Sequence, residues 1–238
     1  MSNSKNIYPD QARNNNFSPL YCEMAMESYT LAFDCYEKIK DNNYNIDLYY
    51  VEEEMYKHCI STIVFAAMTL ESFFNDYAAS CLGDDGFYDN FDKLSVISKF
   101  QLIAKFILNV EIDKSKSYYS HLVSLNKLRN DYVHNKSSEF IYPRITQEML
   151  DLNRERYDGD IVDIEEPTLN RKAIDKDFQD ANNAIKAIRD IAYFFDENDD
   201  SIQAVNRLFH IYTIKYAPER ISDYIKTIVK DFNIKAVK

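Results

Sequence analysis

The chain has 238 residues, of which 46% are hydrophobic and 28% are charged, and its formal net charge at pH 7 is −11. This composition is ordinary for a globular protein that buries a core, and the acidic balance argues against indiscriminate binding to nucleic acid or to anionic membranes. Three glycines and five prolines are too few for the many tight turns of a β-sandwich or barrel. Long helices joined by few loops therefore fit best.

Hydrophobic residues recur at three- and four-residue steps along most of the chain, which predicts a succession of amphipathic helices. Ser18 and Pro19 provide a cap and a first-turn proline for the first helix, and Gly83 with Gly86 is expected to end the second. The predicted helices cover residues 20–40, 48–81, 91–108, 117–134, 172–195, 201–215 and 219–232.

Three further segments complete the predicted domain organisation. Residues 1–18 are mostly polar and predict a flexible N-terminal arm, and the irregular stretch 135–170 predicts an insertion long enough to have a function or to move. The last two helices form a C-terminal extension over residues 200–238, which is too short for a core of its own. We therefore predict an all-α fold with one domain over residues 19–238. It is a bundle of four to five long helices plus a C-terminal helical pair.

The longest mainly apolar stretch, residues 60–70, is too short to span a bilayer, so we expect no contact with a membrane. The N-terminal arm lacks the apolar core of a signal peptide, and we therefore expect a cytoplasmic protein. The four cysteines form no CxxC pair and lie in predicted helices, which favours reduced thiols that are buried or half-buried. They are Cys22, Cys35, Cys59 and Cys81.

The segment with the clearest chemical content is Arg129-Asn130-Asp131-Tyr132-Val133-His134, near the end of the fourth predicted helix. Arg129 and His134 differ by about 140° in azimuth on a helix, yet both side chains can converge if the helix ends near His134. Asn130 and His134 are four apart and share a face. Arginine holds a phosphate in a bidentate fork, asparagine donates to an oxyanion, and histidine transfers protons near pH 7. These groups suit metal-free attack of a ribose 2′-hydroxyl on its neighbouring phosphate.

Two polar side chains of the second predicted helix complete the candidate site. Glu71 lies on an apolar face, where a carboxylate must find a partner or be neutralised. Pairing with Arg129 or with a backbone donor is favoured over a direct catalytic role or simple exposure. Asn75 follows one turn later and is expected to join the same polar network. The alternative interpretation of the hexapeptide is a solvated arginine and a histidine that interacts with the helix dipole.

We predict neither a metal ion nor a cofactor. The remaining histidines, His58, His121 and His210, have no ligand-like spacing to carboxylates or thiols. No glycine-rich phosphate loop, Ser-x-x-Lys pair or GxSxG elbow occurs, which removes the usual nucleotide hydrolases and serine enzymes.

The hexapeptide 129–134 and the segment 70–75 resemble two sequence motifs of the HEPN superfamily. Its mark is an Arg-x4–6-His motif, usually with Asn, Asp or His after the Arg, near the end of a helix in a small bundle. Many members also carry a Leu-Glu-aromatic-Asn pattern like that of residues 70–75. The resemblance covers roughly residues 20–195 and implies a homodimer whose two motifs build one cleft for metal-independent RNA cleavage. It implies that Arg129 stabilises the scissile phosphate, that His134 transfers protons and that Asn130 orients or stabilises.

The sequence therefore favours two alternative functions. The first is an endoribonuclease with RNA as its substrate, as in toxin–antitoxin, abortive-infection or CRISPR phage defence, with an antitoxin or another defence protein as a possible partner. The second is a catalytically inactive HEPN-like interaction or RNA-binding module, which the acidic charge and the 19 tyrosines favour modestly. A toxin neutralised by modification of a tyrosine is a weaker interpretation. That family pattern is Arg-x4-His-x-Tyr, and Lys136 stands at the position of the tyrosine.

Overall fold

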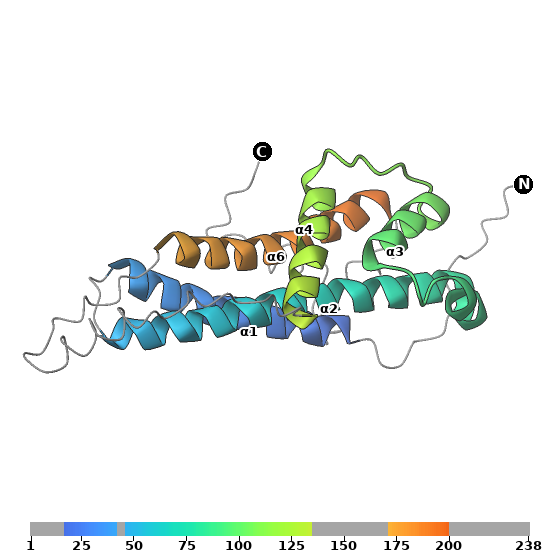
Figure 1. Ribbon diagram of the computed structural model, residues 1–238. Coiled ribbons are helices and arrows are strands. Elements are labelled where there is room, and N and C mark those ends of the chain that lie inside the picture. The colour runs from blue at the N-terminus through green and yellow to red at the C-terminus, as the bar shows by residue number, and fades with distance from the viewer. Residues whose placement is uncertain (1–16, 42–45, 135–170, 200–238) are drawn as a thin grey trace, which may run out of the picture.

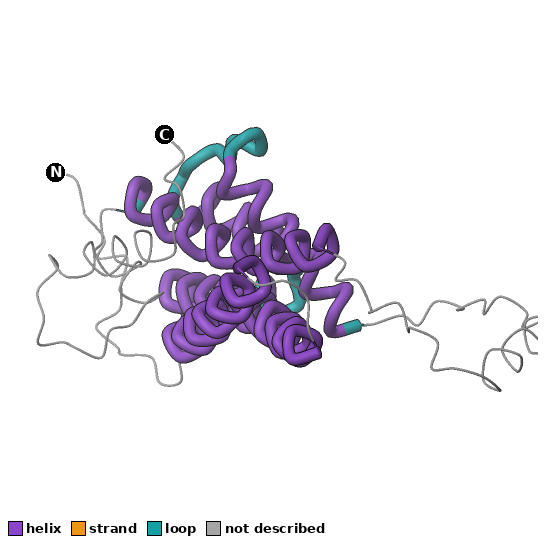
Figure 2. The backbone as a smooth tube through the Cα atoms, turned by 90° about the vertical axis from the view of Figure 1, so that its left-hand side faces the viewer, coloured by secondary structure: helices purple, strands orange, loops and turns teal. Residues whose placement is uncertain are grey.

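The computed structural model describes residues 17–41, 46–134 and 171–199 of the chain. These residues are almost all helical and contain no strand (Figure 1, Figure 2), so the predicted all-α class is confirmed. No helix among them is long and apolar enough to cross a membrane. The predicted insertion and C-terminal pair, and nearly all of the predicted N-terminal arm, lie outside the described residues.

Two long helices form the base of the fold. Helix α1 (Ser18–Asp41) and helix α2 (Ile46–Asn90) lie side by side and run in opposite directions (Figure 1). Small residues such as Ala25 and Ala32 of α1 and Ala66 of α2 are completely buried. Their short side chains let the two backbones approach closely along the pair, which gives a continuous surface for the remaining helices.

Helix α2 extends further than its sequence predicts. The expected end at residue 81 is wrong, because the helix resumes after a kink at Gly83 and ends at Asn90. Gly83 has φ 76° and ψ 164°, a backbone conformation that is essentially restricted to glycine. The additional turns carry Phe87, which is 5% exposed and belongs to the core. Burial of this ring therefore favours helix in a segment whose glycines and aspartates suggest a terminus.

The next helical segment starts later than expected. Helix α3 (Val96–Leu102) begins after Ser95 rather than at residue 91, and the Ser95 hydroxyl accepts a hydrogen bond from the Ser98 backbone N–H at 3.1 Å. This is an ordinary N-terminal cap. The helix then widens into a π-helix, η1 (Ile103–Ile107).

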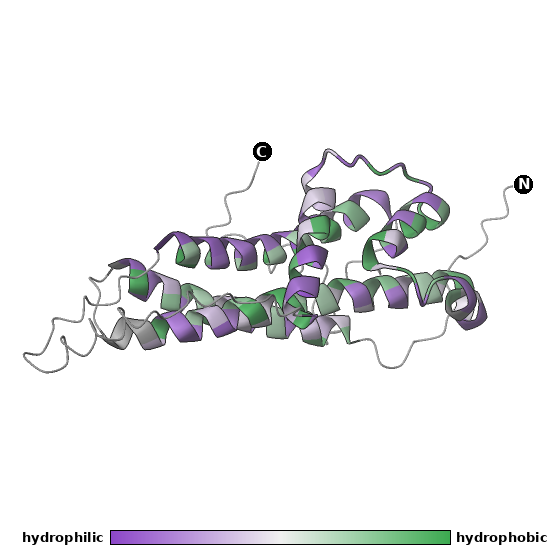
Figure 3. Ribbon diagram, viewed as in Figure 1, coloured by the Kyte–Doolittle hydropathy of each residue, from purple (hydrophilic) through white to green (hydrophobic). Residues whose placement is uncertain are grey.

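Helix α6 (Arg171–Asn198) lies along the α1–α2 pair, and α4 (Ser117–Val133) crosses it at a steep angle (Figure 1). Bands of hydrophobic and hydrophilic residues alternate along α6, as expected for an amphipathic helix (Figure 3). Aromatic rings join these helices where they meet; for example, Phe73 and Phe195 pack edge to face at 4.8 Å between ring centroids. The cluster comprises Phe73, Phe74, Tyr77, Phe100, Tyr118, Phe194 and Phe195.

The cysteines are as predicted. All four are free, with Cys22 and Cys59 buried and Cys35 and Cys81 half-buried. Burial raises the pKa of both buried thiols to about 12. They are therefore neutral core residues with little thiolate to react.

Candidate functional site

The hexapeptide lies at the C-terminal end of α4, as predicted. Helix α4 ends at Val133, and His134 follows as the capping residue, with its backbone N–H donating to the Asn130 carbonyl at 3.0 Å. The side chains of Asn130 and His134 are exposed to solvent. The helix end therefore presents its amide and imidazole groups outward, where a ligand can reach them.

Arg129 is held loosely on the adjacent surface. Its Nη1 donates to the Asn130 side-chain oxygen at 3.1 Å, and its Nη2 lies 3.9 Å from a carboxylate oxygen of Glu71 on α2. The Arg129 and Glu71 side chains are 29% and 38% exposed, so solvent screens their attraction and the pair contributes little to stability. The structure thus brings together Arg129, Asn130 and Glu71. It shows no contact between the side chains of Arg129 and His134.

The charge of Glu71 also acts on a lysine of α3. Lys99 is 2% exposed, and burial lowers its pKa, while the charges of Glu71 and Asp92 act in the opposite direction. Glu71 therefore interacts electrostatically with Lys99 as well as pairing with Arg129. A carboxylate resembles, in charge and in hydrogen-bonding capacity, the phosphate oxygens that arginine and lysine also bind.

A shallow hollow opens beside this group. It lies between α2, α3 and α4, is partly open to solvent, and has room for about one water molecule. Its floor is apolar, and Glu71, Asn126 and Arg129 supply the polar part of its wall; the apolar lining comprises Ala67, Leu70, Val96, Leu122 and Leu125. The hollow places Arg129 at the edge of a concave surface rather than on an open helix face.

Asn75 is not part of this polar group. Its side-chain oxygen is buried and has no hydrogen-bond partner, whereas the sequence predicts that it joins Glu71. A buried carbonyl oxygen without a donor costs about 1–3 kcal/mol. Asn75 is therefore an unsatisfied polar residue of the same helix, and the described residues give it no role in binding.

Tyr132 lies within the hexapeptide and is half-buried. Burial, with smaller contributions from neighbouring acidic groups, raises its pKa to about 12. The hydroxyl therefore stays neutral near pH 7. Among the described residues, no group of three or more His, Cys, Asp or Glu side chains is arranged to hold a metal ion.

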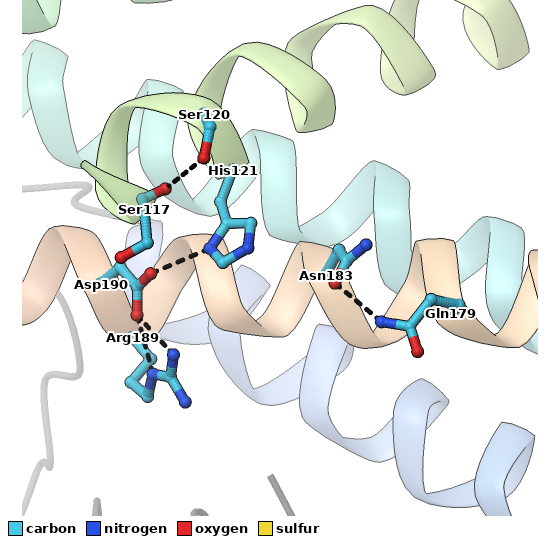
Figure 4. Close-up of polar contacts among 7 residues, drawn as sticks. All are labelled: Ser117, Ser120, His121, Gln179, Asn183, Arg189 and Asp190. Atoms are coloured by element: carbon cyan, nitrogen blue, oxygen red, sulfur yellow. Dashed lines mark hydrogen bonds and ion pairs between the residues drawn. The ribbon is translucent and has the colours of Figure 1, made fainter. Parts of the chain in front are cut away.

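A more buried polar cluster lies at the other end of α4, and the sequence does not predict it. Asp190 of α6 is 8% exposed in its side chain; one oxygen lies 2.9 Å from His121 Nδ1, and the other accepts from Arg189 at 2.6 and 2.8 Å (Figure 4). Ser117 also donates to this carboxylate. The only sign of this cluster in the sequence is that Asp190 lies on the apolar face of a predicted helix. Glu71 is recognised as a candidate for the same reason.

Comparisons of the chain with protein families, with curated proteins and with solved structures give no match.

Proposed function

We propose that the chain is a metal-independent RNA endonuclease of the HEPN type that acts as a homodimer in bacterial defence or as a toxin. The observation that carries the proposal is the placement of Arg129, Asn130 and His134 at one helix end, with Asn130 and His134 exposed and Arg129 at the edge of a hollow. An exposed helix end is accessible to an extended polymer, and a second copy of the chain can approach it from outside.

The chemistry assigns one task to each side chain. Arg129 holds the scissile phosphate and stabilises the charge that develops on it, and Asn130 donates to the same oxygens. The ribose 2′-oxygen attacks phosphorus, the bond to the 5′-oxygen breaks, and a cyclic phosphate remains. One imidazole accepts the proton of the 2′-hydroxyl, and another donates a proton to the leaving 5′-oxygen. Each hexapeptide contains one histidine, so a dimer supplies both through His134 of each copy.

Glu71 has a place in this scheme as the group that the phosphate displaces. Its oxygen lies 3.9 Å from Arg129 Nη2, and both side chains are partly exposed. An exposed ion pair of this kind is worth about 0–1 kcal/mol. Replacing the carboxylate with a substrate phosphate therefore costs little, and Arg129 is already directed towards the position of the anion.

The second candidate is a catalytically inactive interaction module. It is favoured by two valines on the exposed surface of α4, Val123 at 38% and Val133 at 47% exposure, and by the net charge of −11. Apolar side chains next to an exposed motif suit a protein–protein contact, and the overall charge repels RNA at long range.

RNA cleavage assays distinguish the nuclease from the inactive interaction module. Wild-type protein, His134→Ala and Arg129→Ala are incubated with total RNA and with tRNA-rich RNA in EDTA, and light scattering gives the oligomeric state. Loss of a proton-transfer group is expected to reduce cleavage by at least about 100-fold. His58→Ala is the matched control, because His58 is a partly exposed histidine on α2 and retains full activity under the proposal.

Undiminished cleavage by His134→Ala would refute the proposed site. A stable wild-type dimer without any cleavage would instead favour the interaction module. Circular dichroism of each variant shows whether the fold is intact, which is expected because the His134 side chain is exposed and the ion pair of Arg129 with Glu71 is partly exposed.

A further inference from the structure

The carboxylate of Glu71 and the amide of Asn126 share the wall of the small hollow beside Arg129. Asn126 precedes Arg129 by three positions on α4, so the two side chains share one helix face. Glu71 reaches the same place from α2, where its oxygen lies 3.9 Å from Arg129 Nη2. The hollow therefore brings an acceptor, an amide and a cation together from two helices.

Glu71 and Asn126 are not committed to hydrogen bonds within the described residues. The separation of 3.9 Å between Glu71 and Arg129 is too long for a hydrogen bond, and Glu71 makes no other among these residues. The Asn126 side chain is half-buried and has no hydrogen-bond partner in the described part of the chain. Both groups thus keep their hydrogen-bonding capacity for a ligand.

A phosphate bound by Arg129 would release Glu71, and the carboxylate would then need new donors. Its charge acts favourably on buried Lys99 of α3, which favours a position beside the hollow over one turned out into solvent. A carboxylate only accepts hydrogen bonds. A ligand that binds here must therefore present N–H or O–H groups to Glu71.

The size of the hollow decides how such a ligand approaches. The hollow has room for about one water molecule, so a single exocyclic atom can enter it, whereas a ring cannot. A nucleobase of an RNA strand would therefore approach edge-on. Recognition would come from hydrogen bonds to the base edge rather than from stacking.

The four RNA bases differ in the donors that they present on this edge. Guanine carries two adjacent donor groups, N1–H and N2–H, next to the acceptor O6. The two oxygens of a carboxylate accept from both donors at once, and an amide nitrogen donates to O6. Adenine, cytosine and uracil each present a single donor group on their Watson–Crick edge, so they leave one carboxylate oxygen without a partner.

We propose that Glu71 and Asn126 are specificity-determining residues that select guanine in the RNA strand, next to the phosphate held by Arg129. Glu71 accepts from N1–H and N2–H, and Asn126 donates to O6, which enters the hollow. This selection rests on the proposed function, because it requires Arg129 to hold the phosphate. A bidentate contact of this kind discriminates against a wrong base by about tenfold or more.

Binding of RNA that cannot be cleaved tests the selection. Fluorescein-labelled hexanucleotides of five uridines and one guanosine, adenosine, cytidine or uridine are titrated with the full chain, and fluorescence anisotropy gives the affinity. Every ribose carries a 2′-O-methyl group, which blocks attack by the 2′-oxygen. The guanosine strand is expected to bind about tenfold more tightly than the all-uridine strand.

Glu71→Gln is expected to remove this preference, because glutamine has one acceptor oxygen and its amide nitrogen faces a guanine donor. Its affinity for the all-uridine strand is not expected to fall, since Arg129 loses a competing carboxylate. Glu53→Gln is the matched control and should keep the preference. Glu53 is an exposed glutamate of α2 that pairs with Lys57 at 3.0 Å, about 27 Å along the helix axis from Glu71.

Equal affinity for the four strands, no binding of any of them, or a guanine preference that Glu71→Gln retains would overturn the selection, even if the wild-type protein cleaves unmodified RNA. A guanine preference in wild type that Glu71→Gln removes, without any cleavage of unmodified RNA, would refute the nuclease and support the selection.

Discussion

Replacement of Asp190 by asparagine removes one charge from the most buried ion cluster of the described structure. The aspartate accepts with both oxygens: one faces His121 at 2.9 Å, and the other faces two nitrogens of Arg189 at 2.6 and 2.8 Å. Asparagine has one acceptor oxygen and one donor nitrogen. If the amide oxygen faces Arg189, the amide nitrogen faces His121, which must then change to the tautomer that accepts at Nδ1. In either orientation of the amide, the Arg189 charge loses its counter-ion.

The size of the effect follows from the burial of the partners. Asp190 and Arg189 are 8% and 12% exposed in their side chains, and breaking a buried pair on one side costs about 3–5 kcal/mol. His121 is 24% exposed and retains some hydration, which places the loss near the lower limit, at about 3 kcal/mol. For a chain of this size that corresponds to a melting temperature lower by about 6–12 °C.

The assay is urea unfolding followed by circular dichroism at pH 7, with thermal unfolding as a second measure. Asp175→Asn is the matched control: Asp175 also lies on α6, but it is exposed and accepts one hydrogen bond, from the Tyr36 hydroxyl at 2.8 Å. Its replacement is expected to cost less than about 1 kcal/mol. A loss below 1 kcal/mol for Asp190→Asn would refute the reasoning, because the cluster would then be as well solvated as the control.

Acid should remove the same contribution from the wild-type protein. The pKa of Asp190 is lowered by folding, so its stabilisation is complete above the unfolded value of about 3.9 and is lost as the pH falls through the lower folded value. The difference in unfolding free energy between wild type and Asp190→Asn is therefore expected to shrink below about pH 4. A difference that stayed constant down to pH 2 would contradict the assigned ionisation.

Two further substitutions and one thiol reaction test other parts of the fold. Phe195→Ala empties a fully buried position in the aromatic cluster, and urea unfolding should show a loss of about 3–5 kcal/mol. Gly83→Ala meets no neighbour within 4 Å yet places a Cβ at positive φ, so the same measurement should show a loss of about 1–3 kcal/mol from backbone strain. Cys22 and Cys59, whose pKa values burial raises to about 12, should react with a disulfide reagent only after half-buried Cys35 has reacted.

Periodicity predicts those helices whose stability comes from one continuous apolar face. The predicted segments 20–40, 117–134 and 172–195 agree with α1, α4 and α6 to within a few residues. The prediction is wrong between residues 81 and 96, where tertiary burial of Phe87 continues a helix past Gly83. Local signals favour a terminus there, and they lose to a contact that a local sequence window does not contain.

The polar contacts also differ in whether the sequence alone predicts them. The pairing of Glu71 with Arg129 is one of the alternatives that the apolar face of α2 predicts, and the structure shows the two side chains 3.9 Å apart. The pairing of His121 with Asp190 joins residues 69 positions apart. The position of Asp190 next to buried Ile191 and Ile188 shows that it needs a partner, but the sequence cannot select one, because the crossing of α4 over α6 determines which histidine arrives there.

The side chains of α4 differ in how firmly they are held, and this decides what each substitution will do. At the N-terminal end His121 bonds buried Asp190, and the Tyr118 ring packs 4.9 Å from that of Phe194. At the C-terminal end Tyr132 packs against the core, whereas Asn130 and His134 are exposed and Arg129 pairs with partly exposed Glu71. Changes to His121, Tyr118 or Tyr132 should therefore lower stability, whereas changes to Arg129, Asn130 or His134 should leave the fold intact. A loss of RNA cleavage in variants of these three residues, with an unchanged unfolding free energy, would then report on chemistry.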